Sequence, residues 1–251
     1  METMAMESNT MEKMMLRRAA SAQRPVNGSL ELLPLCNMSC DMCYVHLSRE
    51  KTEEKGGLHT ADEWIGLGRE MQKAGVLFLL LTGGEPLLYP DFIMEIAREY
   101  RAQGLNAVVE TCGCVPWETF ARVQPWIDLF LYDLKFVDCE KHRKYCGMGN
   151  ELILANLRRL CESSRVVVRI PIIPGINDTQ EDIDRTGRLL AELGERIEAI
   201  HCLPYHNLGF SKYEALGMEY SLSDVMLPKG GYMETIQKMF EQHGLQVQIG
   251  G

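Results

Sequence analysis

Three cysteines lie close together early in the chain, at Cys36, Cys40 and Cys43. A structural zinc site usually takes four ligands, typically from two closely spaced pairs. Three thiolates instead suit a [4Fe–4S] cluster that leaves one iron open to a small ligand. The spacing Cys-x3-Cys-x2-Cys, followed by an aromatic residue, therefore predicts a cluster here rather than three buried cysteines without a metal.

A second motif, Thr82-Gly83-Gly84-Glu85-Pro86, follows the second predicted strand. Its two glycines allow the backbone to come close to a ligand, and Glu85 offers a carboxylate to an ammonium group. Alone, the motif would be equally compatible with a turn between a strand and a loop. Its place after the cysteine motif favours a binding role.

Five charged or titratable side chains fall at or just beyond the ends of predicted strands: Glu110, Asp133, Lys135, Arg169 and His206. A single residue of this kind is more often a solvated loop residue. The carboxyl ends of parallel strands meet at one edge of a sheet or barrel, where several strands contribute to one pocket. Together, these five residues are therefore expected to line one site.

The elements that position these residues alternate between strands and helices. Strands are predicted at 29–35, 76–81, 106–111, 128–134, 166–172, 197–203 and 247–249, and helices at 61–74, 91–103, 151–163, 179–193 and 232–243, with a short helix around Phe120. This alternation predicts an α/β fold with a parallel sheet. We favour a partial (β/α)6 barrel of the TIM type, although the pattern also allows an open doubly wound sheet. Residues 29–251 form the predicted domain, and residues 1–28 are expected to be a mobile tail that is partly helical around residues 11–20.

The composition narrows the function further. The 251 residues include 26 basic and 35 acidic ones, a net charge of −9, which argues against a general nucleic-acid or anionic-membrane partner. The longest apolar run, 75–82, is too short to span a bilayer, and residues 1–15 lack the apolar core of a signal peptide. Nine clustered cysteines indicate a metal or redox protein of the reducing cytoplasm.

The two motifs resemble those of the radical S-adenosylmethionine (SAM) superfamily. From residue 110 onward, the chain is similar to the activating enzymes of glycyl radical enzymes, such as the one that acts on pyruvate formate-lyase. This similarity rests on Glu110-Thr111-Cys112-Gly113, Asp133-Leu134-Lys135, His142, Val168-Arg169-Ile170-Pro171, Pro174-Gly175-Ile176-Asn177-Asp178 and Leu203-Pro204-Tyr205-His206-Asn207-Leu208-Gly209.

The resemblance implies roles in SAM binding. The backbone of Gly83 and Gly84 and the carboxylate of Glu85 would meet the methionine amine of SAM, and Tyr44 would lie near the adenine. Lys135 and His206 would hold SAM, with Arg169 lining the pocket, and these three are the expected catalytic residues.

The resemblance also implies a monovalent cation near the SAM ribose. Its expected ligands are the side chains of Glu110, Thr111 and Asp133 and the backbone carbonyl of Leu131. The best-known activating enzyme has aspartate at the position of Glu110, so this chain differs there by one methylene.

The implied activity is the reductive cleavage of SAM to a 5′-deoxyadenosyl radical, which removes a Cα hydrogen from a glycine of a partner enzyme. The implied partners are that glycyl radical enzyme and a flavodoxin or ferredoxin as electron donor. The chain itself is expected to be a cytoplasmic monomer.

An alternative is a radical SAM enzyme that modifies a peptide or a small molecule, because residues 29–105 look more like the peptide-modifying enzymes. Those usually carry a cysteine-rich C-terminal extension for further clusters, whereas no cysteine follows Cys202 here. A second cluster on Cys112, Cys114, Cys139 and Cys146 is conceivable. We favour small buried apolar roles for the six cysteines outside the motif.

Anaerobically reconstituted protein should contain about four irons per chain, because one cubane on three thiolates holds that number. Replacing Cys36, Cys40 and Cys43 together by alanine should remove the cluster, as measured by iron and sulfide analysis. A parent protein that holds about eight irons would instead reveal a second cluster.

Overall fold

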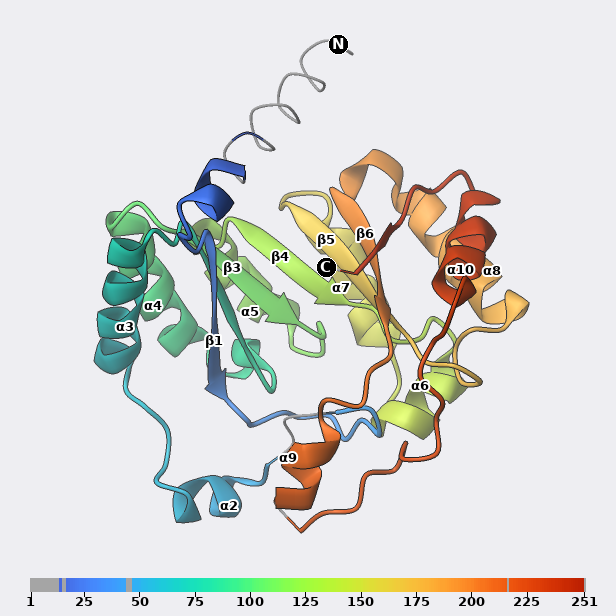
Figure 1. The fold of residues 1–251 in the computed structure, drawn as a ribbon, viewed down its shortest axis with the longest axis horizontal. Coiled ribbons are helices and arrows are strands. Elements are labelled where there is room, and N and C mark those ends of the chain that lie inside the picture. The colour runs from blue at the N-terminus through green and yellow to red at the C-terminus, as the bar shows by residue number, and fades with distance from the viewer. Residues whose placement is uncertain (1–13, 15–16, 44–46, 216, 251) are drawn as a thin grey trace.

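Seven parallel strands form one sheet in the computed structural model, in their order along the chain (Figure 1). The structure describes residues 14, 17–43, 47–215 and 217–250. The strands are β1 (Asn27–Leu33), β2 (Phe78–Gly83), β3 (Asn106–Thr111), β4 (Leu129–Asp133), β5 (Val166–Ile172), β6 (Ala199–Pro204) and β7 (Gln248–Ile249). Each strand pairs only with its neighbours in the described residues, so β1 and β7 are the two edges of an open, partial barrel. The predicted fold class is confirmed.

The outer face of the sheet is covered by the helices α3 (Ala61–Ala74), α4 (Pro90–Ala102), α5 (Trp117–Val123), α7 (Glu151–Leu160), α8 (Gln180–Leu193) and α10 (Tyr232–Glu241) (Figure 1). The shorter helices α2 (Arg49–Glu54), α6 (Cys139–Cys146) and α9 (Phe210–Ala215) lie toward the ends of the strands (Figure 1). Short 3₁₀ turns occupy Pro86–Leu88, Gln124–Trp126 and Gly194–Arg196. The core lies between the helices and the sheet, where strand residues such as Leu81, Phe130 and Val168 are fully buried. No helix in this described part is both long and apolar enough to cross a membrane.

Several element boundaries differ from those predicted. β1 begins at Asn27, because Asn27 and Gly28 already pair with Phe78 and Leu79 of β2, so the sheet includes two residues assigned to the tail. Residues 17–21 of that tail are helical. The short helices α2, α6 and α9 were not predicted. The α6 sequence CEKHRKYC is mostly polar, so no apolar period marks it as a helix.

The register of the strands places polar side chains next to one another at the carboxyl edge of the sheet. Asp133 of β4 pairs with Arg169 of β5, and Arg169 pairs in turn with His201 of β6. Glu110 lies on β3, the neighbour of β4 on its other side. Successive side chains of a strand point to opposite faces, so these residues face the barrel interior while their apolar neighbours face the helices.

Two glycines bring β1 and β2 together at this edge. Gly84 N–H donates to the carbonyl of Leu33 at 2.6 Å, and Glu85 N–H donates to that of Leu35 at 2.9 Å. A Cβ atom at Gly83 would clash with the Leu33 carbonyl, and one at Gly84 would clash with that of Leu35. The glycines therefore serve first to let two strands approach.

Gly84→Ala should lower the free energy of unfolding by about 1–3 kcal/mol, because the new methyl group meets rigid backbone. Urea unfolding of the iron-loaded protein measures this change. Gly66→Ala is the matched control, since a Cβ there meets no atom within 4 Å. The control lies within α3, where alanine should stabilise the protein by about 0.5–1 kcal/mol. Equal effects of the two substitutions would contradict this role of Gly84.

Candidate active site

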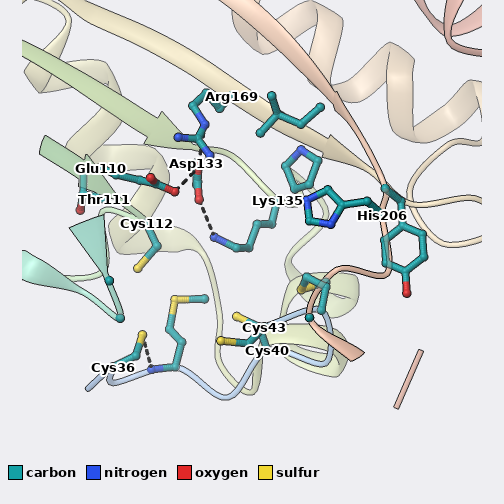
Figure 2. Close-up of a pocket in the computed structure, with 18 of the residues that line it drawn as sticks. Cys36, Cys40, Cys43, Glu110, Thr111, Cys112, Asp133, Lys135, Arg169 and His206 are labelled. Carbon is teal, nitrogen blue, oxygen red and sulfur yellow. Dashed lines mark hydrogen bonds and ion pairs between the residues drawn. The ribbon is translucent and has the colours of Figure 1, made fainter. Parts of the chain in front are cut away.

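One cavity lies at the carboxyl ends of the strands, where the sequence predicted a site. Its wall contains residues from the loop after β1 and from the ends of β2 to β6: Cys36, Cys40, Cys43, Gly83, Gly84, Glu110, Thr111, Cys112, Asp133, Lys135, Arg169, Tyr205, His206 and Tyr220, among others. Figure 2 shows the three motif cysteines on one side of this cavity and the charged residues on the other. Most of the predicted site residues are thus brought together.

The cysteine loop is held by the end of α6. Ser39 N–H donates to the carbonyl of Cys146 at 3.2 Å, and Asp41 N–H donates to that of Tyr145 at 2.9 Å. The last carbonyls of a helix lack partners within the helix, so they are free to accept these bonds. α6 ends at Gly147, which has the left-handed backbone conformation, with φ 81°. Helix and loop therefore fix each other.

Two further cysteines contact the motif cysteines. A hydrogen bond with the side chain of Cys112 is the main cause that lowers the pKa of Cys36 to about 7. A hydrogen bond with Cys146 and burial both raise the pKa of Cys40. Cys112 and Cys146 are themselves almost fully buried. Additional sulfur atoms therefore surround the motif, although neither residue was predicted to belong to the site.

The loop fits an iron–sulfur cluster better than a single metal ion. Three half-buried thiols share one cavity wall with the thioether side chains of Met38 and Met42. Over the described residues, no three His, Cys, Asp or Glu side chains are close enough to hold one ion. A cubane places its cysteine ligands on different irons, which suits thiols that share a cavity without converging on a point.

Arg169 lies between two carboxylates on the opposite side of the cavity (Figure 2). Its Nη2 is 3.0 Å from Glu110 Oε1, and its Nε is 3.3 Å from Asp133 Oδ1. The contact with Asp133 is an ion pair without the geometry of a hydrogen bond. Lys135 Nζ is 3.4 Å from Asp133 Oδ2. Because none of these four side chains is more than 18% exposed, their charges interact more strongly than charges at the surface.

The surroundings shift the pKa values of two of these groups, Glu110 and Lys135. Burial and the neighbouring charge of Asp133 raise the pKa of Glu110, and Arg169 opposes this shift. Burial would lower the pKa of Lys135, but Asp133 and the neighbouring thiols outweigh it, so that this pKa lies well above its ordinary value. Lys135 therefore presents a permanent positive charge to the cavity at neutral pH.

The side chains expected to bind a monovalent cation already have partners within the chain. Arg169 already pairs with both carboxylates. The hydroxyl of Thr111 donates to Glu85 at 2.9 Å and accepts from Gly113 N–H at 2.9 Å. Leu131 lies inside the ladder between β3 and β5 and does not line the cavity.

Glu85 is fully buried and does not line the cavity, in contrast to its predicted role beside an ammonium group. Its carboxylate accepts from Leu87 N–H at 3.0 Å, from Cys112 N–H at 2.8 Å and from the Thr111 hydroxyl. Burial raises its pKa, and these hydrogen bonds oppose the shift. The carboxylate turns into the gap between β2 and β3, so it joins the ends of the two strands.

The remaining predicted residues have different outcomes. His206 lines the cavity, and its Nδ1 accepts from Leu208 N–H at 3.4 Å. Gly83 and Gly84 line it through their backbone. Tyr44 lies outside the described residues.

Sequence reasoning missed two aromatic residues in the cavity wall. The hydroxyl of Tyr205 lies 3.1 Å from that of Tyr220 and donates to the carbonyl of Leu222 at 3.0 Å. Tyr205 directly precedes His206, so its place after a strand could have indicated a site residue. Tyr220 follows no strand, and no pattern in the sequence marks it.

Known proteins that are similar to this chain identify its family. The model of the radical SAM superfamily matches residues 30–190. The indoleacetate decarboxylase activating enzyme of Tractidigestivibacter scatoligenes is 34% identical over 82% of this chain and 68% of its own length. The chain spans about half to two thirds of the length of the curated relatives that it matches.

Solved structures give the same result. A domain of the pyruvate-formate lyase-activating enzyme from Bacteroides vulgatus ATCC 8482 matches 68% of this chain and 98% of its own, with a TM-score of 0.58 and 32% identity. Streptococcus suis SuiB bound to S-adenosylmethionine matches 91% of this chain and 51% of its own, with a TM-score of 0.71. At 13% identity, that second match supports the fold alone. The chain therefore belongs to the radical SAM superfamily and, within it, to the glycyl-radical-enzyme activating enzymes that its sequence resembles.

Proposed function

We propose that this chain cleaves SAM reductively and uses the resulting 5′-deoxyadenosyl radical to form a glycyl radical on a partner enzyme. One observation carries the proposal: a single cavity brings the three motif cysteines together with side chains on or just beyond β4, β5 and β6, namely Asp133, Lys135, Arg169 and His206. An electron carrier without catalytic activity would not need this second set of side chains.

Cys36, Cys40 and Cys43 would hold the [4Fe–4S] cluster, which supplies one electron to the sulfonium of SAM when it is bound. Lys135 and His206 face the cavity and would hold the ligand. The positive charge of Lys135 suits the carboxylate of the methionine moiety, and Asp133 would accept from a ribose hydroxyl. These residues would fix the reactive carbon near its target, which is the contribution that a protein makes to such chemistry.

Glycine suits this chemistry as a target. It has no side chain to prevent its backbone from lying against the cavity mouth, and its Cα radical is stabilised by the adjacent peptide groups. The mouth is formed by loops at the carboxyl ends of the strands, the usual position of active sites in barrels of this kind.

We extend the proposal to the surroundings of the enzyme. A flavodoxin or ferredoxin would supply the electron, and the chain would work as a monomer in the cytoplasm.

The alternative function, modification of a peptide or small molecule, is favoured by the character of residues 29–105. Both functions use the same cleavage of SAM. They differ in the product, since a modified peptide carries no lasting protein radical.

Lys135→Ala and His206→Ala should each weaken SAM binding by about tenfold or more, because a hydrogen bond to a charged group contributes about 1.5–3 kcal/mol. The iron content should stay at the parent value, since neither side chain is a thiolate. Calorimetry with SAM and iron analysis measure the two quantities. Lys73→Ala and His59→Ala are matched controls, because both side chains are about two-thirds exposed or more at the surface. Parent-like binding by both variants would refute the assigned roles.

A matched glycyl radical enzyme that is deuterated at the Cα of its glycines tests the function directly. Deuterium should appear in 5′-deoxyadenosine by mass spectrometry, and a persistent glycyl radical signal should appear on the partner by electron paramagnetic resonance. Label transfer from a small peptide alone, with a closed-shell product and no protein radical, would favour the alternative function.

A further inference from the structure

The carboxylates expected to bind a monovalent cation already share a positive charge. Arg169 Nη2 lies 3.0 Å from Glu110, and Arg169 Nε lies 3.3 Å from Asp133. The second oxygen of Glu110 accepts from the Thr82 hydroxyl at 2.9 Å, so its carboxylate is fixed on both sides. A metal ion would therefore have to compete with the guanidinium of Arg169 for these two carboxylates.

The backbone explains why Arg169 can fill this place. Asp133 and Arg169 are register partners on adjacent strands, and Glu110 lies on the next strand beyond Asp133. A glutamate side chain is long enough to reach across β4 toward β5. The planar guanidinium carries several donors in a fixed arrangement, so it can contact carboxylates on two strands at once.

The charges around this position already balance. Glu110 and Asp133 contribute two negative charges, and Arg169 and Lys135 contribute two positive charges within ion-pair distance. A monovalent cation would add a third positive charge to a region that is at most 18% exposed, where unbalanced charge is costly. The Thr111 hydroxyl is already engaged with Glu85 and Gly113.

We infer that the guanidinium of Arg169 is a built-in cation that replaces a dissociable monovalent metal ion beside the SAM pocket. SAM binding by this enzyme is therefore independent of which monovalent cation the solution contains. The inference rests on the proposed function only in that SAM is the ligand of the cavity.

The test compares SAM affinity in potassium, sodium and tetramethylammonium chloride at equal ionic strength, by calorimetry on the cluster-loaded protein. The parent should show less than about a twofold change in Kd among the three salts. Arg169→Gln removes the built-in charge, so its affinity should be higher in potassium or sodium than in tetramethylammonium by about fivefold or more, the lower range of ordinary coupling between two ligands. Arg165→Gln is the control, because Arg165 pairs with Glu198 at the surface. It should behave like the parent.

Ion binding without SAM provides a second readout. ²³Na line broadening should detect no saturable site in the parent and a new one in Arg169→Gln. If that variant does not fold, the parent measurements alone decide. A parent whose SAM affinity rises about fivefold with potassium or sodium, or which binds sodium saturably, would overturn the inference. So would a folded Arg169→Gln that stays insensitive to the cation. Failure of label transfer to a glycyl radical enzyme would instead affect only the proposed function.

Discussion

The site depends on the close approach of β1 and β2 at Gly84. The absence of a side chain there lets the backbone of residues 84 and 85 donate to the carbonyls of Leu33 and Leu35. This contact directs the cysteine loop, which follows Leu35, across the end of the sheet. Glu85 then turns inward and receives hydrogen bonds from Thr111 and Cys112 at the end of β3. The motif therefore connects the ends of β1, β2 and β3 while its two glycines still line the cavity.

The opposite side of the cavity depends on electrostatics rather than on backbone contact. Its charged residues come from β3, β4 and β5, and parallel pairing brings them within ion-pair distance. Burial and the charge of Asp133 raise the pKa of Glu110, because an unpaired carboxylate is costly at this depth. Arg169 and Lys135 provide the opposing charge, so the strand ends can carry reactive groups without destabilising the sheet.

The boundaries of strands and helices could be predicted from the sequence where local signals agree with the tertiary fold. Strands 106–111 and 166–172 match the structure at both ends, and so does helix 61–74, with the capping box at Thr60 and Glu63 and with Gly75 in the left-handed conformation. α6 was not predicted, because its sequence is mostly polar and only His142 and Cys146 on it are buried, so no apolar period marks it. The positions of side chains at strand ends were predictable from topology, but their partners were not. Glu85 accepts hydrogen bonds from the end of β3, and Arg169 of β5 pairs with carboxylates on β4 and β3. Only the folded structure determines these partners.

A cavity whose wall contains ion pairs suits a ligand that carries both positive and negative charges. SAM has an ammonium group, a carboxylate and a sulfonium, so each ion pair that it disrupts can be replaced by one that it forms. Asp133 is shared by Lys135 and Arg169, so it keeps Arg169 as a partner if Lys135 turns toward the ligand. Exchange of partners avoids leaving a buried charge alone, which is the costly step when a single member of such a pair is removed. Under the proposed function, the same charges that stabilise this edge of the sheet would orient the ligand toward the cysteine loop.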